Sequence, residues 1–134
     1  MSTAAAGNDK RHDLPVSRAG LWFAVLGGPV AWTLHLLTAY LLAEFGCLTW
    51  MGRWMFLGAS AVFWSVLVMT ISTAAMGATA IYTGVAIYQQ LKDFAATPHR
   101  DAQSATARIG IYTSVYAVLV ILVESLPLIY YIRC

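Results

Sequence analysis

The sequence predicts an all-α integral membrane protein with three transmembrane helices. Hydrophobic residues make up 60% of the 134 positions and charged residues 10%, whereas an average soluble domain has about 45–50% apolar and about 25% charged residues. Charged residues are also missing from three long runs, 19–43, 54–91 and 109–123. A spanning helix needs roughly 20 predominantly apolar residues, and the short alternating segments of a membrane β-barrel do not occur here. The runs therefore indicate helices that cross a bilayer.

The first run predicts a span over about residues 19–45, preceded by a polar tail at residues 1–18. The tail, MSTAAAGNDKRHDLPVSR, differs from a secretory signal peptide. The apolar run that follows it is too long for the hydrophobic region of such a peptide and lacks a cleavage-type end. We expect the tail to lie in the cytoplasm and the run to remain as a transmembrane helix.

The run at 54–91 is the ambiguous element. Its 38 residues would extend about 57 Å as one helix, against about 30 Å of hydrocarbon core. The alternative is a hairpin of two helices, which would give four spans. A turn within residues 70–80 would have Gly77 but no proline, aspartate or asparagine, so its turn chemistry is poor. We predict one long helix whose cytoplasmic end projects into water.

This middle helix carries small residues at four-residue spacing, Ala74 with Ala78 and Ala80 with Gly84. Small residues at this spacing permit close approach of a second helix in a membrane. The pattern predicts that the helix packs against a neighbour, without identifying that neighbour.

The third span is predicted over about residues 109–132, and the basic residues set the orientation. With three spans, the side of the N-terminal tail holds Lys10, Arg11, Arg18, Lys92, Arg100 and Arg108, and the opposite side holds Arg53 and Arg133. Cytoplasmic loops carry an excess of lysine and arginine. We therefore expect a multi-pass protein of the bacterial inner membrane, with the N-terminus in the cytoplasm and the C-terminus in the periplasm.

The two cysteines, Cys47 and Cys134, would then both emerge on the outer side. That compartment is oxidising in a bacterial envelope, and disulfides persist there. A bridge needs Cα atoms within about 7 Å, which two helix ends at the same depth can provide. We predict a Cys47–Cys134 disulfide; the alternative is two inert thiols. The chain has no CxxC motif, which argues against thiol redox catalysis.

His35 and Glu124 are the ionisable residues deep within the predicted spans. They lie 12 and 10 residues before the cysteine that follows each, which is about 18 Å and 15 Å down the helix axis. An ionisable side chain at such depth costs about 2.5–3.5 kcal/mol and usually has a partner inside the protein. We predict that His35 and Glu124 form a buried polar pair, with Thr38 and Ser125 able to complete the network.

Several roles stay open for this pair. It can be a structural hydrogen bond or a contact with a partner subunit, a haem or quinone site using His35, or part of a proton path. Haem is the weaker option because His35 is the one histidine within a span, and two axial histidines would need a dimer or a partner. We expect no metal site, and His12 and His99 lie in polar segments where solvation explains them.

The two ends of the chain resemble a group of small bacterial membrane proteins. The segments are GPVAWTLHLLTAYLLAEFGC (28–47) and LVILVESLPLIYYIRC (119–134). Members share a Gly-Pro-x-x-Trp-x-x-His element in the first span, a cysteine after it, and a terminal cysteine after a proline-containing last span; here these are Gly28, Pro29, Trp32, His35, Cys47, Pro127 and Cys134. Their genes tend to lie among those for haem–copper cytochrome c oxidases and related respiratory complexes. The resemblance implies an accessory or assembly role and implies no reaction.

The sequence contains no catalytic constellation, phosphate-binding loop or carboxylate pair, and its net charge of +2 is too small to indicate nucleic-acid binding. We therefore expect a non-catalytic accessory subunit, without a cofactor, that packs against other membrane subunits of a respiratory or photosynthetic electron-transfer complex. The alternatives are a haem- or quinone-binding protein using His35, and a proton-conducting or transport component using His35 and Glu124.

Overall fold

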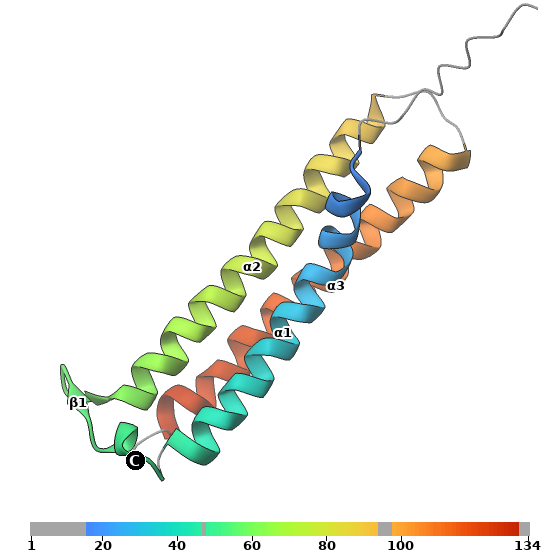
Figure 1. Ribbon diagram of the computed structural model, residues 1–134. Helices are drawn as coiled ribbons and strands as arrows, with labels where there is room; N and C mark the ends of the chain where they lie inside the picture. Colours follow the sequence, from blue (N-terminus) through green and yellow to red (C-terminus); the bar gives the residue numbers. More distant parts are fainter. Residues whose placement is uncertain (1–15, 47, 94–97, 132–134) are drawn as a thin grey trace, which may run out of the picture.

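Three long helices lie side by side in an elongated bundle (Figure 1). The computed structural model describes residues 16–46, 48–93 and 98–131. The helices are α1 (Arg18–Gly46), α2 (Ala61–Lys92) and α3 (Pro98–Tyr131). Each is long and apolar enough to cross a membrane, and each packs against the other two. The chain is a multi-pass, all-α membrane protein with three spans, which confirms the predicted fold class.

The middle run forms one continuous helix of 32 residues, so the alternative of four spans is wrong. The helix begins later than the start of the charge-free run suggested, at Ala61 and not at Trp54. Ser60 has extended backbone and its hydroxyl accepts a hydrogen bond from the Phe63 N–H at 3.3 Å, the usual role of a residue that caps a helix N-terminus. The third helix begins earlier than predicted, at Pro98, where the first helical position tolerates a residue without an N–H.

A short connection joins α1 to α2 at one end of the bundle. It contains a single 3₁₀ turn, η1 (Trp50–Gly52), and a two-stranded antiparallel hairpin, β1 (Met55–Phe56) with β2 (Ala59–Ser60). The two turn residues, Leu57 and Gly58, have φ of 49° and 79°, and two positive φ values are typical of the tightest hairpin turns.

Large apolar side chains of this connection are exposed at the end of the bundle. The Trp64 indole N–H donates to the Phe56 carbonyl at 3.0 Å and ties the hairpin to α2. The exposed residues are Leu48, Trp50, Trp54, Met55, Phe56 and Leu57. Aromatic side chains gather at membrane–water boundaries, so this end of the bundle fits the edge of the bilayer.

The interior of the bundle combines small and hydroxyl-bearing residues with aliphatic side chains. After Val62, the buried positions of α2 alternate at steps of four and three residues: Val66, Thr70, Thr73, Gly77, Ala80, Gly84, Ile87 and Leu91. This mean period of 3.5 is that of helices packed in a left-handed bundle. Of the expected small residues, Ala80 and Gly84 are buried, whereas Ala78 faces outward.

The backbones of α1 and α3 approach each other closely at two glycines. A Cβ added at Gly28 would lie 2.5 Å from the Ser114 Cα, and one added at Gly110 would lie 2.8 Å from the Ala24 carbonyl oxygen. Both distances are too short for any side chain. Glycine at these two positions is therefore what allows the two helices to touch.

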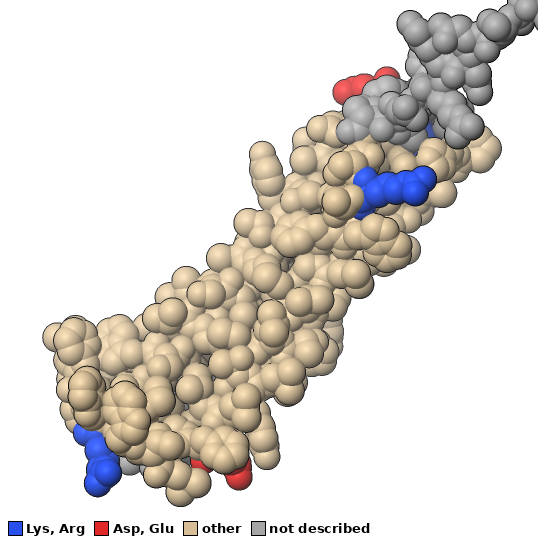
Figure 2. All heavy atoms as spheres, in the orientation of Figure 1, with Lys and Arg blue, Asp and Glu red and all other residues tan. Residues whose placement is uncertain are grey.

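Charged side chains gather at the two ends of the bundle, and the face drawn in Figure 2 is uncharged between them. The helices of 29, 32 and 34 residues are about 44–51 Å long, so their ends extend beyond a hydrocarbon core of about 30 Å. The described basic residues at the end where α2 passes to α3 are Arg18, Lys92, Arg100 and Arg108, and Arg53 lies at the opposite end.

Candidate functional site

His35 lies at the centre of the three-helix contact and is 1% exposed. Its Nδ1 is 3.3 Å from the Thr73 hydroxyl of α2, and its Nε2 is 3.3 Å from the Ser125 hydroxyl of α3. A neutral imidazole has one donor and one acceptor nitrogen. One hydroxyl can therefore accept from the ring while the other donates to it, and both nitrogens are satisfied.

Thr70 extends this arrangement, because its hydroxyl is 3.3 Å from that of Ser125. All three hydroxyls also lie within hydrogen-bond distance of backbone carbonyls of their own helices. We call His35, Thr70, Thr73 and Ser125 the His35 cluster. Every helix contributes to it, so it fixes the three helices against one another in one register.

Glu124 does not form the predicted pair with His35. Its carboxylate accepts a hydrogen bond from the Trp32 indole N–H at 3.2 Å, and in the described residues no hydrogen bond joins it to His35. The reason is helical geometry, because each residue turns about 100° from the last. Ser125 occupies the inward position on α3, which leaves the neighbouring Glu124 partly exposed at the side of the bundle. The sequence also predicted that His35 and Glu124 lie at a similar depth. His35 contacts Ser125, the residue next to Glu124, so the two depths differ by about one residue.

Of the two residues expected to complete the network, Ser125 does so and Thr38 does not. Thr38 lies on the outside of the α1–α2 contact, where with Trp64 and Ser72 it lines a groove of about 530 Å³. Thr70 and Thr73 take the place that sequence reasoning gave to Thr38. The sequence analysis missed Thr70 and Thr73; their spacing of three residues, which places them on one side of α2, is the signal that could have found them.

The Gly-Pro-x-x-Trp-x-x-His element is a contact surface for α3. Gly28 touches Ser114, as described above, and the Trp32 and His35 side chains bond to the neighbouring residues 124 and 125. Positions four and three residues apart lie on one side of a helix. Three of the four residues of this element therefore have a structural explanation in the packing of α1 on α3.

The enclosure of His35 does not suit haem ligation. An axial ligand needs one ring nitrogen free to reach the iron, whereas here both nitrogens face hydroxyls and the ring is enclosed by three helices. A haem at His35 would have to displace Thr73 or Ser125. Across residues 16–46, 48–93 and 98–131, no three histidine, cysteine or acidic side chains are grouped to hold a metal ion.

Cys47 and Cys134 lie outside the described residues, so their disulfide stays a prediction, and His12 lies outside them as well. The helix ends that precede the two cysteines, Gly46 of α1 and Tyr131 of α3, are at the same end of the bundle (Figure 1). His99 is exposed at the opposite end.

Comparison with known proteins identifies no relative of this chain. No protein-family model matches it, and neither a curated protein nor a solved structure matches it. The geometry of its own residues is therefore the basis for inferring its function.

Proposed function

We propose that the chain is a non-catalytic accessory or assembly subunit that packs against another membrane subunit through the side of α1 and α3 carrying Trp32 and Glu124. The main observation that supports this proposal is the position of Glu124. It is partly exposed on α3, seven residues before the helix ends at Tyr131, which is about 10 Å along the axis.

A carboxyl group there is costly if only lipid covers it. The cost at the centre of a bilayer is about 2.5–3.5 kcal/mol, and a carboxylate has about four positions for accepting hydrogen bonds. Within the described residues it receives one hydrogen bond, from Trp32. Donors from a protein partner would satisfy the remaining positions, and lipid tails cannot.

The His35 cluster supports a structural role over a chemical one. Both ring nitrogens are occupied and the ring is buried, so the buried histidine serves to hold the helices together. The likeness of the two ends to small proteins encoded beside haem–copper oxidases supports a respiratory or photosynthetic electron-transfer complex as the partner. The basic residues at the α2–α3 end support an inner-membrane location with that end in the cytoplasm.

Affinity purification of the full chain from its native membrane tests this proposal. We expect cytochrome-containing polypeptides to co-purify with the wild-type chain, and to be lost or strongly reduced with Glu124→Leu. The matched control is Leu122→Ala, two residues away on α3 and 49% exposed, which should retain the partners. A chain that purifies alone, or equal recovery with Glu124→Leu, contradicts the proposal.

The same preparation separates the alternatives. A Soret band carried by the chain itself and lost in His35→Ala would favour haem binding. Proton flux through liposomes containing only this chain, lost in Glu124→Gln, would favour a conducting role.

A further inference from the structure

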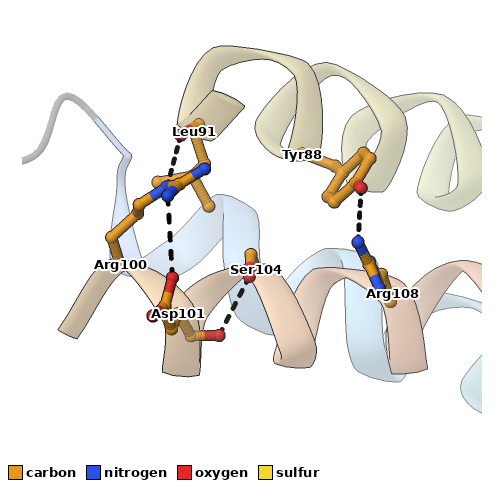
Figure 3. Close-up of polar contacts among 6 residues, drawn as sticks. All are labelled: Tyr88, Leu91, Arg100, Asp101, Ser104 and Arg108. Carbon is orange, nitrogen blue, oxygen red and sulfur yellow. Dashed lines mark hydrogen bonds and ion pairs between the residues drawn. The ribbon is translucent and has the colours of Figure 1, made fainter. Parts of the chain in front are cut away.

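Two cations meet at one tyrosine ring near the junction of α2 and α3. The Lys92 ammonium nitrogen is 4.8 Å from the Tyr88 ring centroid, and the Arg108 guanidinium carbon is 4.9 Å from it. Arg108 also donates a hydrogen bond from Nη2 to the Tyr88 hydroxyl at 2.6 Å (Figure 3). Both basic side chains are exposed, so the ring holds two positive charges at the surface of the bundle.

These two charges have no carboxylate partner among the described residues. Of the nearby acids, Asp101 pairs with Arg100 at 3.7 Å, while Arg100 also donates to the Leu91 carbonyl (Figure 3). Asp93 follows Lys92 in the chain and forms no ion pair with Lys92 or Arg108. Like charges gathered on one ring repel each other. An anion placed beside them would be attracted to both cations and would offset their mutual repulsion.

The cavity beside Arg108 has both polar and apolar walls. It encloses about 280 Å³ and is lined by Tyr88, Arg108, Ile111 and Tyr112. Arginine and the two phenol hydroxyls can bind the oxygens of a phosphate group, while Ile111 offers an apolar surface on the side toward the bundle's centre. A ligand with a phosphate joined to an apolar portion fits this combination.

The depth of the cavity matches the headgroup layer of a bilayer. Arg108 lies 23 residues before the end of α3 at Tyr131, which is about 34 Å along the helix. The hydrocarbon core is about 30 Å thick, so Arg108 sits just beyond its edge when the other end of α3 lies at the opposite boundary. Phospholipid phosphates occupy this level.

We propose that Tyr88, Lys92 and Arg108 form a binding site for the phosphate of an anionic phospholipid, such as phosphatidylglycerol. Basic pockets between transmembrane helices bind such headgroups. A zwitterionic lipid is disfavoured because its own ammonium group would face two cations. The site does not depend on the proposed subunit role, because it is at the other end of the bundle from Glu124.

Native mass spectrometry of the full chain in detergent tests this site. Titration with phosphatidylglycerol should give a bound-lipid peak at lower lipid concentration than titration with phosphatidylcholine. Arg108→Gln should weaken phosphatidylglycerol binding by at least about fivefold, the equivalent of about 1 kcal/mol per basic residue, and leave the phosphatidylcholine signal unchanged. The matched control, Arg53→Gln at the opposite end, should bind like the wild type.

Several results would overturn the proposal. These are equal binding of the two lipids by the wild-type chain, equal weakening by Arg53→Gln, or full binding by Arg108→Gln. Displacement of the lipid by excess inorganic phosphate would show a site for free phosphate. Should Arg108→Gln fail to fold, as judged by circular dichroism, Tyr88→Phe removes the hydroxyl and keeps the ring, and it too should weaken phosphatidylglycerol binding.

Discussion

At the scale of single residues, burial of His35 decides which partners it has. The sequence correctly indicated that a histidine deep in an apolar helix needs polar neighbours. It pointed to a carboxylate, whereas the structure provides hydroxyls from Thr73 and Ser125. Hydroxyls are small enough to fit between closely packed helices. The one that accepts from the ring can donate its proton to a carbonyl of its own helix, and the other donates its single proton to the ring. A carboxylate in the same place would bring a charge into the dry centre of the bundle, where its cost is highest.

Replacement of His35 by alanine should destabilise the bundle by about 2 kcal/mol. The change leaves a cavity in the core and removes two interhelical hydrogen bonds, each worth about 0.6 kcal/mol in membrane proteins. Unfolding with increasing dodecyl sulfate in mixed micelles measures the loss. The control is His99→Ala, an exposed histidine whose replacement should change stability by less than about 0.5 kcal/mol.

Double-mutant cycles should separate the bonds that the structure shows from the pair that the sequence suggested. Trp32→Phe combined with Glu124→Ala should be non-additive by about 0.5 kcal/mol or more, because the two side chains share a hydrogen bond. His35→Ala combined with Glu124→Ala should show a smaller coupling, since an electrostatic interaction but no hydrogen bond links the two side chains. A larger coupling energy for the second pair would contradict the structure and support the His35–Glu124 pair that the sequence predicted.

At the scale of helices, the sequence predicted each span but not its bounds or its buried side. The hairpin before α2 is apolar, so composition alone could not divide it from the helix. The cap at Ser60 and the two positive φ values at Leu57 and Gly58 decide where the helix begins. The polar stretch that begins α3 lay outside the predicted third span, because an apolar composition indicates burial in lipid and is no direct measure of helicity.

Replacement of Gly28 by alanine should cost roughly 1–3 kcal/mol, the usual range for overpacking a core. The added Cβ would meet backbone of α3 at Ser114, which cannot move aside without separating α1 from α3. The same dodecyl sulfate titration provides the measurement. Gly20→Ala is the matched control, because the nearest atom to its Cβ is the Ser17 hydroxyl oxygen at 3.0 Å and no backbone atom of another helix lies among the three nearest. That hydroxyl accepts from the Gly20 N–H, so the control should cost at most about 1 kcal/mol, the usual worth of a helix cap. Equal effects of the two changes would contradict close contact at Gly28.

At the scale of the whole molecule, the odd number of spans sets which ends meet. With three helices, the ends of α1 and α3 that precede the cysteines are together and the α2–α3 junction is at the far end (Figure 1). An even number would have separated Cys47 from Cys134 across the bilayer. The predicted bridge therefore depends on the number of spans in the complete chain, which neither α1 nor α3 sets by itself.

The predicted Cys47–Cys134 disulfide should change the mobility of the chain between reducing and non-reducing gels. Its loss in Cys47→Ser should lower stability by about 2–4 kcal/mol, the typical contribution of a bridge that closes a long loop. Alkylation of unreduced protein gives a second readout, because bridged thiols are protected. Identical mobility with both thiols alkylated, or a C-terminal tag accessible only from the cytoplasm, would remove the prediction.

The sequence by itself determined the environment of this protein, the class of its fold and the number of its spans. The environment and the fold class follow from the absence of charge over long runs, which leaves a helix in lipid as the stable state. The number of spans follows from the poor turn chemistry of residues 70–80 as well. The tertiary structure alone decided which side of each helix is buried, because helices that are apolar all round carry no hydrophobic pattern to mark the inner side. It also decided that Ser125 and Thr73 face His35 while Glu124 turns to Trp32, since a difference of one position on a helix changes the direction of a side chain by about 100°.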